Sequence, residues 1–481
     1  MSKIKTPQSG ETGQLSWLYD PKEQSLTLSG AGAIPNYPIA ETPWQEFREQ
    51  IESIVLEEGV TRIGDYAFYD CTALKSVEIP EGVTQIGESA FACCQSLESV
   101  TIPGSVTEIG EGAFESCSDL LVLELTSGLK HVGAFAFSEC FSLRALDLPD
   151  SVERIDRSAF TGAALQELVI PSNVQEIGDN AFNGCIRLSS LTLSEGIRVI
   201  EEMAFSNCSD LTEVLIPASV ERLGDGVFAD CLAMTQIAVA PESKHFVVRD
   251  NILYSKDLST LVHYPAGKEE QEFTLPEEVR KIAGLAFASN YFLMEVMLGD
   301  HLEEVGSYAF ARCSCLSFMS LPAQTTRLGV SPFHDCTMLL EIEVDPSNPY
   351  YSSVDGVLYN KDQTQLIQYP AGLYEDFYKA PDTVREIAEY ACYDAQYLEV
   401  LKIPAGVRKI GDMAFAFCDK LCDVEIRVAD PAQIEVGMMA FFSVAGTPRT
   451  LRVPQGSCKL YEKSEQWQDL AHKIVEQRTK S

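Results

Sequence analysis

The chain has no run of apolar residues long enough to cross a lipid bilayer, and it is poor in basic residues. A membrane-spanning helix needs about 18 or more consecutive apolar residues, and no stretch of these 481 residues approaches that length. Only 36 residues are lysine or arginine, against 71 aspartate or glutamate, so the formal net charge is −35. This excess of negative charge repels phosphate backbones and anionic lipid surfaces. It argues against nucleic acid as a partner and favours a positively charged one.

Motifs of the common enzyme classes are also missing. The sequence contains no G-x-S-x-G nucleophile elbow, no P-loop and no G-x-G-x-x-G before a helix. Its six histidines are scattered, and its closely spaced cysteines lack paired C-x-x-C spacing. We therefore predict no catalytic residue, no cofactor and no metal site. One enzyme alternative stays open, a polysaccharide-active protein on a β-helix-like scaffold, because so many acidic residues form carboxylate pairs by chance.

The first residues, MSKIKTPQSGETGQ, lack the apolar core of a secretory signal peptide. As the chain stands, we expect a cytoplasmic protein. If a signal peptide has been removed ahead of Met1, the expectation changes to a secreted or cell-surface protein. In either case we expect a monomer.

What the sequence does contain is a repeat. Most intervals between successive copies are 23 residues, and two are 59, which is 23 plus 36. The chain therefore carries the same insertion twice, near residues 246–270 and 351–375. The marker of the repeat is an Ala-Phe dipeptide or a close variant, whose second residue is Phe68, Phe91, Phe114, Phe137, Phe160, Phe182, Phe205, Phe228, Phe287, Phe310, Phe333, Cys392, Phe415 or Phe441.

A single copy has too little apolar surface to fold alone. In one copy Val77 and Ile79 alternate with polar residues and predict a strand, a second extended piece leads to Ile86, and the Ala-Phe pair predicts a helical turn. About seven apolar groups per copy contribute roughly 1.5–3 kcal/mol each when buried. Ordering the residues of one copy costs about 1–2 kcal/mol each in backbone entropy. Stacking of the copies is therefore obligatory.

The repeat pattern L-x-x-[VIL]-x-[IL]-P-x-x-V-x-x-I-G-x-x-A-F-x-x-C resembles the leucine-rich repeats of the BspA type, found in bacterial and protist surface proteins. The resemblance extends from Ile51 to Val453. It implies an α/β repeat solenoid, a curved horseshoe with a parallel sheet on one face and short helical turns on the other.

The two ends differ from the repeats, as a solenoid requires. We predict an N-terminal tail and cap over residues 1–50, the solenoid over residues 51–454 and a helical cap over residues 455–481. Within the solenoid, each insertion is predicted to contain a β-hairpin.

The N-terminal cap is predicted as a hairpin over Leu15–Tyr19 and Leu26–Ser29, followed by a short helix. Thr42 is placed to cap this helix, and Trp44 is available to cover the first repeat. At the other end, residues 459–477 are predicted to form a helix whose covering face carries Leu460, Trp467, Leu470 and Ile474.

The cysteines follow the repeat as well. A position that recurs indicates a role that recurs, and a small apolar side chain in the core fills that role. This pattern favours buried free thiols over a disulfide framework, which is typical of irregular, loop-rich domains. Ten of the fifteen cysteines lie three residues after the Phe, at Cys71, Cys94, Cys117, Cys140, Cys185, Cys208, Cys231, Cys313, Cys336 and Cys418.

The outward-facing strand positions give a candidate binding surface. If Val77 points into the core, its neighbours in the strand point to the open face of the sheet. An ordinary solvated sheet is the simplest interpretation, but apolar residues exposed on a rigid sheet are typical of protein-binding surfaces. Carrying the register along the chain selects Glu78, Glu124, Asp147, Glu167, Val169, Glu213, Leu215, Glu295, Met297, Phe318, Glu341 and Glu343.

Taken together, these features predict a non-enzymatic module that binds a protein ligand, with a basic protein favoured by charge, through the open sheet. The resemblance implies a bacterial protein with a surface or adhesion role. The alternative is a cytosolic acidic protein that inhibits or scaffolds a basic protein.

Overall fold

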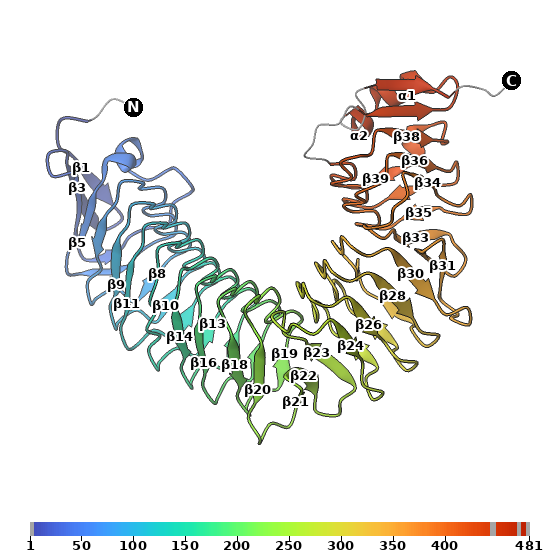
Figure 1. Cartoon of the computed structure of the whole chain (residues 1–481). Helices are drawn as coiled ribbons and strands as arrows, with labels where there is room; N and C mark the ends of the chain where they lie inside the picture. The colour runs from blue at the N-terminus through green and yellow to red at the C-terminus, as the bar shows by residue number, and fades with distance from the viewer. Residues whose placement is uncertain (1–3, 443–448, 469–472, 478–481) are drawn as a thin grey trace. The chain divides into compact units, whose positions relative to one another are not determined.

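The computed structural model describes residues 4–442, 449–468 and 473–477. The chain divides into two compact units, Met1–Lys256 and Asp257–Ser481. Within each unit successive copies of the repeat stack as coils, and equivalent strands of neighbouring coils pair in parallel (Figure 1). The predicted repeat solenoid with a parallel sheet is thereby confirmed.

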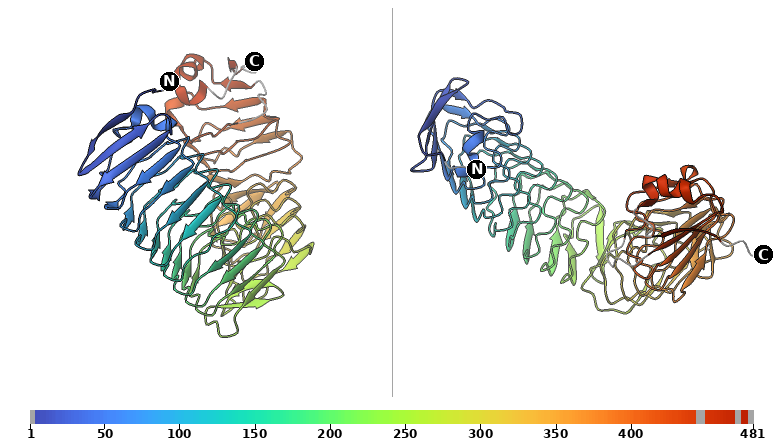
Figure 2. Two further views of the ribbon diagram at one scale, coloured as in Figure 1. Left: turned by 90° about the vertical axis from the view of Figure 1, so that its left-hand side faces the viewer. Right: turned by 90° about the horizontal axis from the view of Figure 1, so that it is seen from above.

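In unit 1 the sheet that carries the predicted binding residues, here called the open sheet, receives one strand from most coils (Figure 2). Pairing is in register, with Val122 opposite Ser99. Alternation then buries one side chain and exposes the next, as with buried Val77 and exposed Glu78, while Ile79 is only partly buried. The strands form three hydrogen-bonded groups. The first is β1 (Gln8–Thr12), β2 (Leu15–Asp20), β3 (Ser25–Gly30), β5 (Ser53–Leu56), β7 (Ser76–Glu78), β9 (Ser99–Ile102) and β11 (Val122–Leu125), the second is β14 (Glu167–Ile170) and β16 (Ser190–Leu193), and the third is β18 (Glu213–Ile216) and β20 (Gln236–Val239).

A second sheet of two-residue strands runs along another side of unit 1. It comes from the Val-x-x-Ile-Gly piece of each repeat, as predicted, and comprises β8 (Gln85–Ile86), β10 (Glu108–Ile109), β12 (His131–Val132), β13 (Arg154–Ile155), β15 (Glu176–Ile177), β17 (Val199–Ile200) and β19 (Arg222–Leu223). The remaining elements of unit 1 are β4 (Gly32–Ala33), β6 (Val60–Arg62), β21 (Phe246–Arg249), β22 (Ile252–Ser255) and the 3-10 helix η1 (Gln45–Gln50).

Unit 2 repeats this plan. Its open sheet has two parts, β24 (Glu272–Thr274), β26 (Glu295–Met297), β28 (Phe318–Leu321) and β30 (Glu341–Val344), then β34 (Phe377–Lys379), β36 (Val400–Ile403), β38 (Asp423–Ile426), β40 (Thr450–Val453) and β41 (Lys473–Glu476). The other elements are β23 (Thr260–His263), β25 (Lys281–Ile282), β27 (Glu304–Val305), β29 (Arg327–Leu328), β31 (Tyr351–Val354), β32 (Val357–Asn360), β33 (Gln365–Gln368), β35 (Glu386–Ile387), β37 (Lys409–Ile410), β39 (Glu435–Val436), η2 (Pro431–Gln433), α1 (Cys458–Lys463) and α2 (Glu465–Gln468).

The core of unit 1 is a column of stacked phenylalanine rings, one from each coil. The ring centroids of Phe114 and Phe137 lie 5.2 Å apart, and those of Phe137 and Phe160 lie 5.3 Å apart. The register cysteines are buried beside this column. The thiol of Cys117 donates a hydrogen bond to the carbonyl oxygen of Phe91 in the preceding coil at 3.3 Å. The Ala-Phe-x-x-Cys motif therefore builds contacts between coils.

The Ala-Phe segment itself is not helical, so the predicted helical turns are wrong. The backbone N–H groups of Tyr66, Phe68 and Asp70 each donate to a carbonyl of the next coil at 2.8 Å, whereas helical N–H groups bond within their own segment. Tyr66 and Asp70 have φ values of +57° and +59°. Residues at φ above zero interrupt a right-handed helix. Apolar residues spaced by three positions fit this turn as well as they fit a helix.

The N-terminal hairpin is confirmed, because β2 pairs antiparallel with β3. The predicted cap at Thr42 is wrong. η1 begins later, with Trp44 before it, and the carbonyl rather than the side chain of Thr42 accepts the hydrogen bond of Gln45 N. Trp44 does cover the first coil, because its buried ring stacks on Phe68 at 5.4 Å.

The predicted helix over residues 459–477 is wrong in its last part. Residues Lys473–Glu476 form β41, which pairs in parallel with β40. The unpaired backbone groups at the edge of β40 form hydrogen bonds with this segment, and helix propensity, which is a local property, does not take such bonds into account. Trp467 is buried, Leu460 is exposed and Ile474 lies in β41. Leu470 lies outside the described residues.

The second insertion contains the predicted hairpin, because β32 pairs antiparallel with β33. β31 adds a further antiparallel strand beside β32. In unit 1 the first insertion contains the antiparallel pair β21 and β22, which corresponds to β31 and β32. Insertions also continue the aromatic column, since Tyr264 stacks on Phe287 at 5.0 Å. Each insertion is therefore an extra coil, which accounts for its length.

We expect the register cysteines to react slowly with a thiol reagent in the native protein. Burial raises the pKa of the Cys140 and Cys185 thiols to about 12, and the thiolate is the reactive species. Cysteine labelling followed by mass mapping at pH 8 should mark the partly exposed cysteines, Cys458 among them, before Cys140 and Cys185. Denaturation should then make the register cysteines react quickly. Labelling of native Cys140 as fast as Cys458, or a disulfide at Cys140, would contradict the buried-thiol interpretation.

Candidate functional site

The predicted binding residues lie on the outward side of the open sheet. On β14, for example, Glu167 and Val169 are exposed while Leu168 and Ile170 are buried. Eleven of the twelve side chains are exposed, and Phe318 is partly buried. Val169, Leu215 and Met297 have exposed fractions of 57%, 55% and 42%. The predicted register is therefore correct at the candidate positions.

In unit 1 three of the candidates line a smaller hollow. Asp147, Glu167 and Val169 line a hollow of about 330 Å³ at a point where the coil of Asp147 has no open-sheet strand. Glu124 accepts a hydrogen bond from Thr101 on the neighbouring strand at 3.0 Å. The remaining candidates of this unit, Glu78, Glu213 and Leu215, do not line that hollow.

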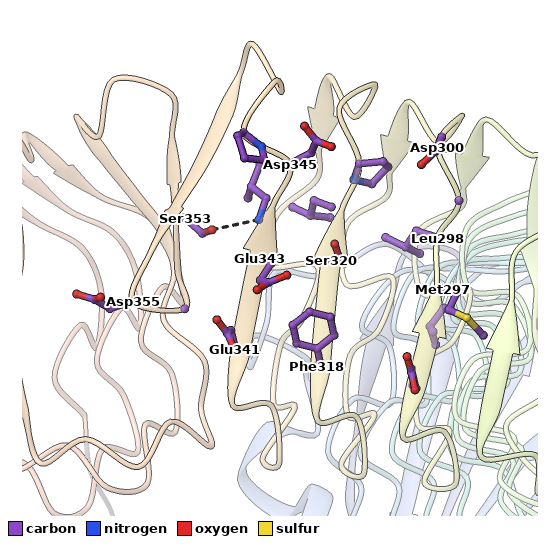
Figure 3. A pocket seen from close by; sticks show the side chains of 18 residues that line it. Met297, Leu298, Asp300, Phe318, Ser320, Glu341, Glu343, Asp345, Ser353 and Asp355 are labelled. Atoms are coloured by element: carbon purple, nitrogen blue, oxygen red, sulfur yellow. Dashed lines mark hydrogen bonds between the residues drawn. The ribbon is translucent and has the colours of Figure 1, made fainter.

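Unit 2 brings five candidates together. Glu295, Met297, Phe318, Glu341 and Glu343 line a hollow of about 840 Å³ over β26, β28 and β30. Figure 3 shows Phe318 between Met297 on one side and Glu341 and Glu343 on the other. This space, here called the acidic hollow, is the largest concave surface that we describe on the open sheet.

The second insertion forms one wall of the acidic hollow. Its turn lies against β30. The N–H of Ile342 donates to the carbonyl of Gly356 at 2.9 Å, and the N–H of Val344 donates to the hydroxyl of Ser353 at 3.1 Å. Gly356 has φ +78°, and a Cβ there would lie 3.3 Å from the side chain of Glu341. A glycine therefore allows the turn to approach the strand closely.

Sequence reasoning missed three carboxylates of this site, those of Asp300, Asp345 and Asp355. They lie outside the strands, at the ends of β26 and β30 and in the turn of the insertion. Asp345-Pro346 at a strand end and Asp355-Gly356 in a turn are dipeptides that predict turns from the sequence. The sequence does not show that these two turns lie on the same surface, because their proximity depends on how the insertion folds against β30.

The acidic hollow carries six carboxylates, and none of its lining residues, all of them described, is lysine, arginine or histidine. Within the described residues none of the six forms a salt bridge. At equivalent outward positions nearer the end of unit 2 the acids are paired, Asp423 with Arg452 at 2.8 Å and Glu425 with Lys402 at 3.1 Å. The negative charge of the acidic hollow is thus not compensated by salt bridges among the described residues.

The acidity of Asp345 is reinforced locally. The hydroxyl and the backbone N–H of Ser347 donate to its carboxylate at 2.6 and 2.8 Å. These hydrogen bonds hold the pKa of Asp345 below its usual value, and the charge of Lys361 is a smaller cause in the same direction. Because hydrogen bonds to the charged form favour it, Asp345 stays ionised at neutral pH.

The described residues contain no cluster of three or more His, Cys, Asp or Glu side chains arranged to hold a metal ion. None of the described helices is long and apolar enough to span a membrane.

Fold and site together define a repeat solenoid with an open, acidic parallel sheet. Residues 45–165, 130–259, 266–374 and 376–446 match the family model described as the BspA type leucine rich repeat region, in six copies. The chain belongs to this family, which confirms the resemblance seen in the repeat. Leucine-rich-repeat proteins commonly act as protein-interaction or surface-adhesion modules that use their extended sheet surfaces.

Several solved structures are similar to this chain. A leucine rich cell surface protein from Faecalibacterium prausnitzii is 23% identical, with 97% of this chain and 98% of that chain covered and a TM-score of 0.48. The pneumococcal vaccine antigen PcpA is 18% identical, with 99% and 100% covered and a TM-score of 0.43. A leucine-rich repeat protein from Bacteroides ovatus is 20% identical, with 97% and 99% covered and a TM-score of 0.40. No curated protein matches the chain.

Proposed function

We propose that this protein is a non-enzymatic binding module that holds a positively charged protein ligand on its open sheet. The observation that supports this proposal best is the acidic hollow, where six carboxylates without salt bridges surround Met297 and Phe318. Carboxylates arranged in this way attract a basic partner from a distance and speed its association. Exposed apolar side chains exclude water once the partner is bound and slow its release.

Two biological roles are compatible with such a binding module. Membership of the family, whose members are commonly interaction modules, supports a surface or adhesion role. The alternative is a cytosolic inhibitor or scaffold of a basic protein, and the net charge of −35 supports the basic nature of that partner. Both roles place the ligand on the same face, so one set of variants tests both.

The kinetics of ligand binding test the proposal. With a ligand purified by capture on the full chain, Glu167→Lys with Glu213→Lys should slow association about tenfold at low salt, because charge reversal removes the long-range attraction. Leu215→Ala with Phe318→Ala should instead speed dissociation about tenfold, because buried apolar contacts are lost. Surface plasmon resonance at two salt concentrations separates the two effects. If neither pair changes either rate, the ligand does not use the open sheet.

A further inference from the structure

The two insertions of the chain offer an internal comparison. Residues 356–373 align with residues 251–268, a separation of 105 residues. The folds correspond as well, because β31 pairs antiparallel with β32 in one and β21 with β22 in the other. The open-sheet strands before the two insertions, β30 and β20, also end in the same way. Asp345 N donates to Leu321 O at 3.0 Å, and Ala240 N donates to Ile216 O at 2.9 Å.

The chemistry of the two sites differs although the backbone is the same. Glu341, Glu343 and Asp345 border the second insertion. Subtracting 105 from each number gives the equivalent residues of the first insertion, which are the neutral Gln236, Ala238 and Ala240. The repeat therefore folds without acidic side chains at these positions. Asp345 accepts hydrogen bonds from Ser347 at the strand end, whereas among the described residues the side chains of Glu341 and Glu343 form no hydrogen bond or salt bridge. The coil does not need these two glutamates, so their carboxylates are available to a ligand.

The arrangement across the strands is specific. Phe318 on β28 lies opposite Glu295 on β26 and opposite Glu341 on β30. Neighbouring strands are about 4.8 Å apart, so the two carboxylates flank the aromatic ring over a span of about 10 Å. Glu343 forms the next outward position on β30. The open sheet thus presents an acid–aromatic–acid row with further carboxylates at its edge.

We propose that the acidic hollow binds an extended basic segment of the partner protein, with lysine or arginine on both sides of an apolar side chain. This inference rests on the proposed function and names its ligand chemistry. An extended segment presents every second side chain on one face, at intervals of about 6.8 Å. Its apolar side chain packs on Phe318 while the flanking cations reach Glu295 and Glu341. A volume of about 840 Å³ is within the range of ligand sites and admits several side chains.

Synthetic peptides test this inference on the full chain. The probe is a labelled 13-residue peptide that repeats Lys-Thr-Leu-Thr and ends in lysine, whose residues favour an extended backbone. Its twin replaces each lysine by glutamate. Fluorescence anisotropy at low salt should show saturable binding of the basic peptide and none of the acidic twin. Absence of binding by the basic peptide, or equal binding of both, would overturn the inference.

Matched variants then separate the acidic hollow from general charge attraction. The triple variant Glu341→Gln, Glu343→Gln and Asp345→Asn should lower the affinity for the basic peptide about tenfold. This is the effect expected for the loss of three partly exposed ion pairs. The same charge is removed from turns outside the open sheet by Glu88→Gln, Glu139→Gln and Asp225→Asn, all at exposed positions. This control should change the affinity less than twofold. Phe318→Ala should also weaken binding about tenfold. Thermal melting checks that both triple variants remain folded.

The outcomes distinguish this inference from the proposed function. Equal weakening by both triple variants means that the peptide responds to net charge alone, and the acidic hollow is then not a specific site. If the captured protein ligand nevertheless depends on Glu167 and Glu213, the open sheet remains the binding face. If that ligand responds to neither set of variants, the proposed function fails as well.

Discussion

Replacing Phe137 by alanine is expected to destabilise unit 1 by about 3–5 kcal/mol. The ring is fully buried and stacks between Phe114 and Phe160, with centroid distances of 5.2 and 5.3 Å. In a solenoid each coil contacts only its neighbours, so removal of this ring weakens the interface on both sides. Urea unfolding of the full chain, followed by circular dichroism, measures the change in the free energy of unfolding.

Phe141 provides the control four residues away. Its side chain is 57% exposed, so Phe141→Ala should change the free energy of unfolding by no more than about 0.5 kcal/mol. The account of the core would be wrong if the two variants had the same stability.

Deletion of residues 1–50 is expected to abolish the soluble monomer. The deletion removes Trp44, whose ring covers Phe68 and whose Nε1 donates to Ala67 O at 2.9 Å. It also removes β3, which pairs in parallel with β5. The truncated chain therefore exposes an apolar coil and an unpaired strand edge, both of which promote association. Size-exclusion chromatography with light scattering measures the outcome.

A shorter deletion supplies the comparison. Removing residues 1–7 leaves β1, β2, β3 and η1 in place, so this variant should remain monomeric with a melting temperature close to that of the full chain. A clean monomer with unchanged melting after deletion of residues 1–50 would refute the capping role.

Much of the fold follows from the repeat, because one periodic pattern encodes local structure and stacking together. The position of Phe137 in the column and the outward position of Glu167 both follow from the register alone. The conformation around Tyr66 and Asp70 does not, because their backbone partners lie in the next coil. β41 escaped prediction for the same reason, since its hydrogen bonds depend on the edge of β40 rather than on its own residues.

The candidate site likewise has a part that the sequence predicts and a part that it does not. Strand alternation identifies Glu295, Phe318 and Glu341, which lie in one row. The acidic hollow itself depends on the approach of the second insertion to β30, and Asp355 enters through that approach. A tertiary contact of this kind has no periodic signature, so sequence reasoning found the face but missed the concave site on it.

Carboxyl footprinting tests the central claim most directly. Aspartate and glutamate side chains are modified with a carbodiimide and a labelled amine, with and without the protein ligand, and the modified positions are mapped by mass spectrometry. We expect the ligand to protect Glu295, Glu341 and Glu343 on the open sheet. Glu88 and Glu139, which are exposed on the turns beside the phenylalanine column, should stay fully reactive. Protection of Glu88 and Glu139 with none on the open sheet would contradict the account.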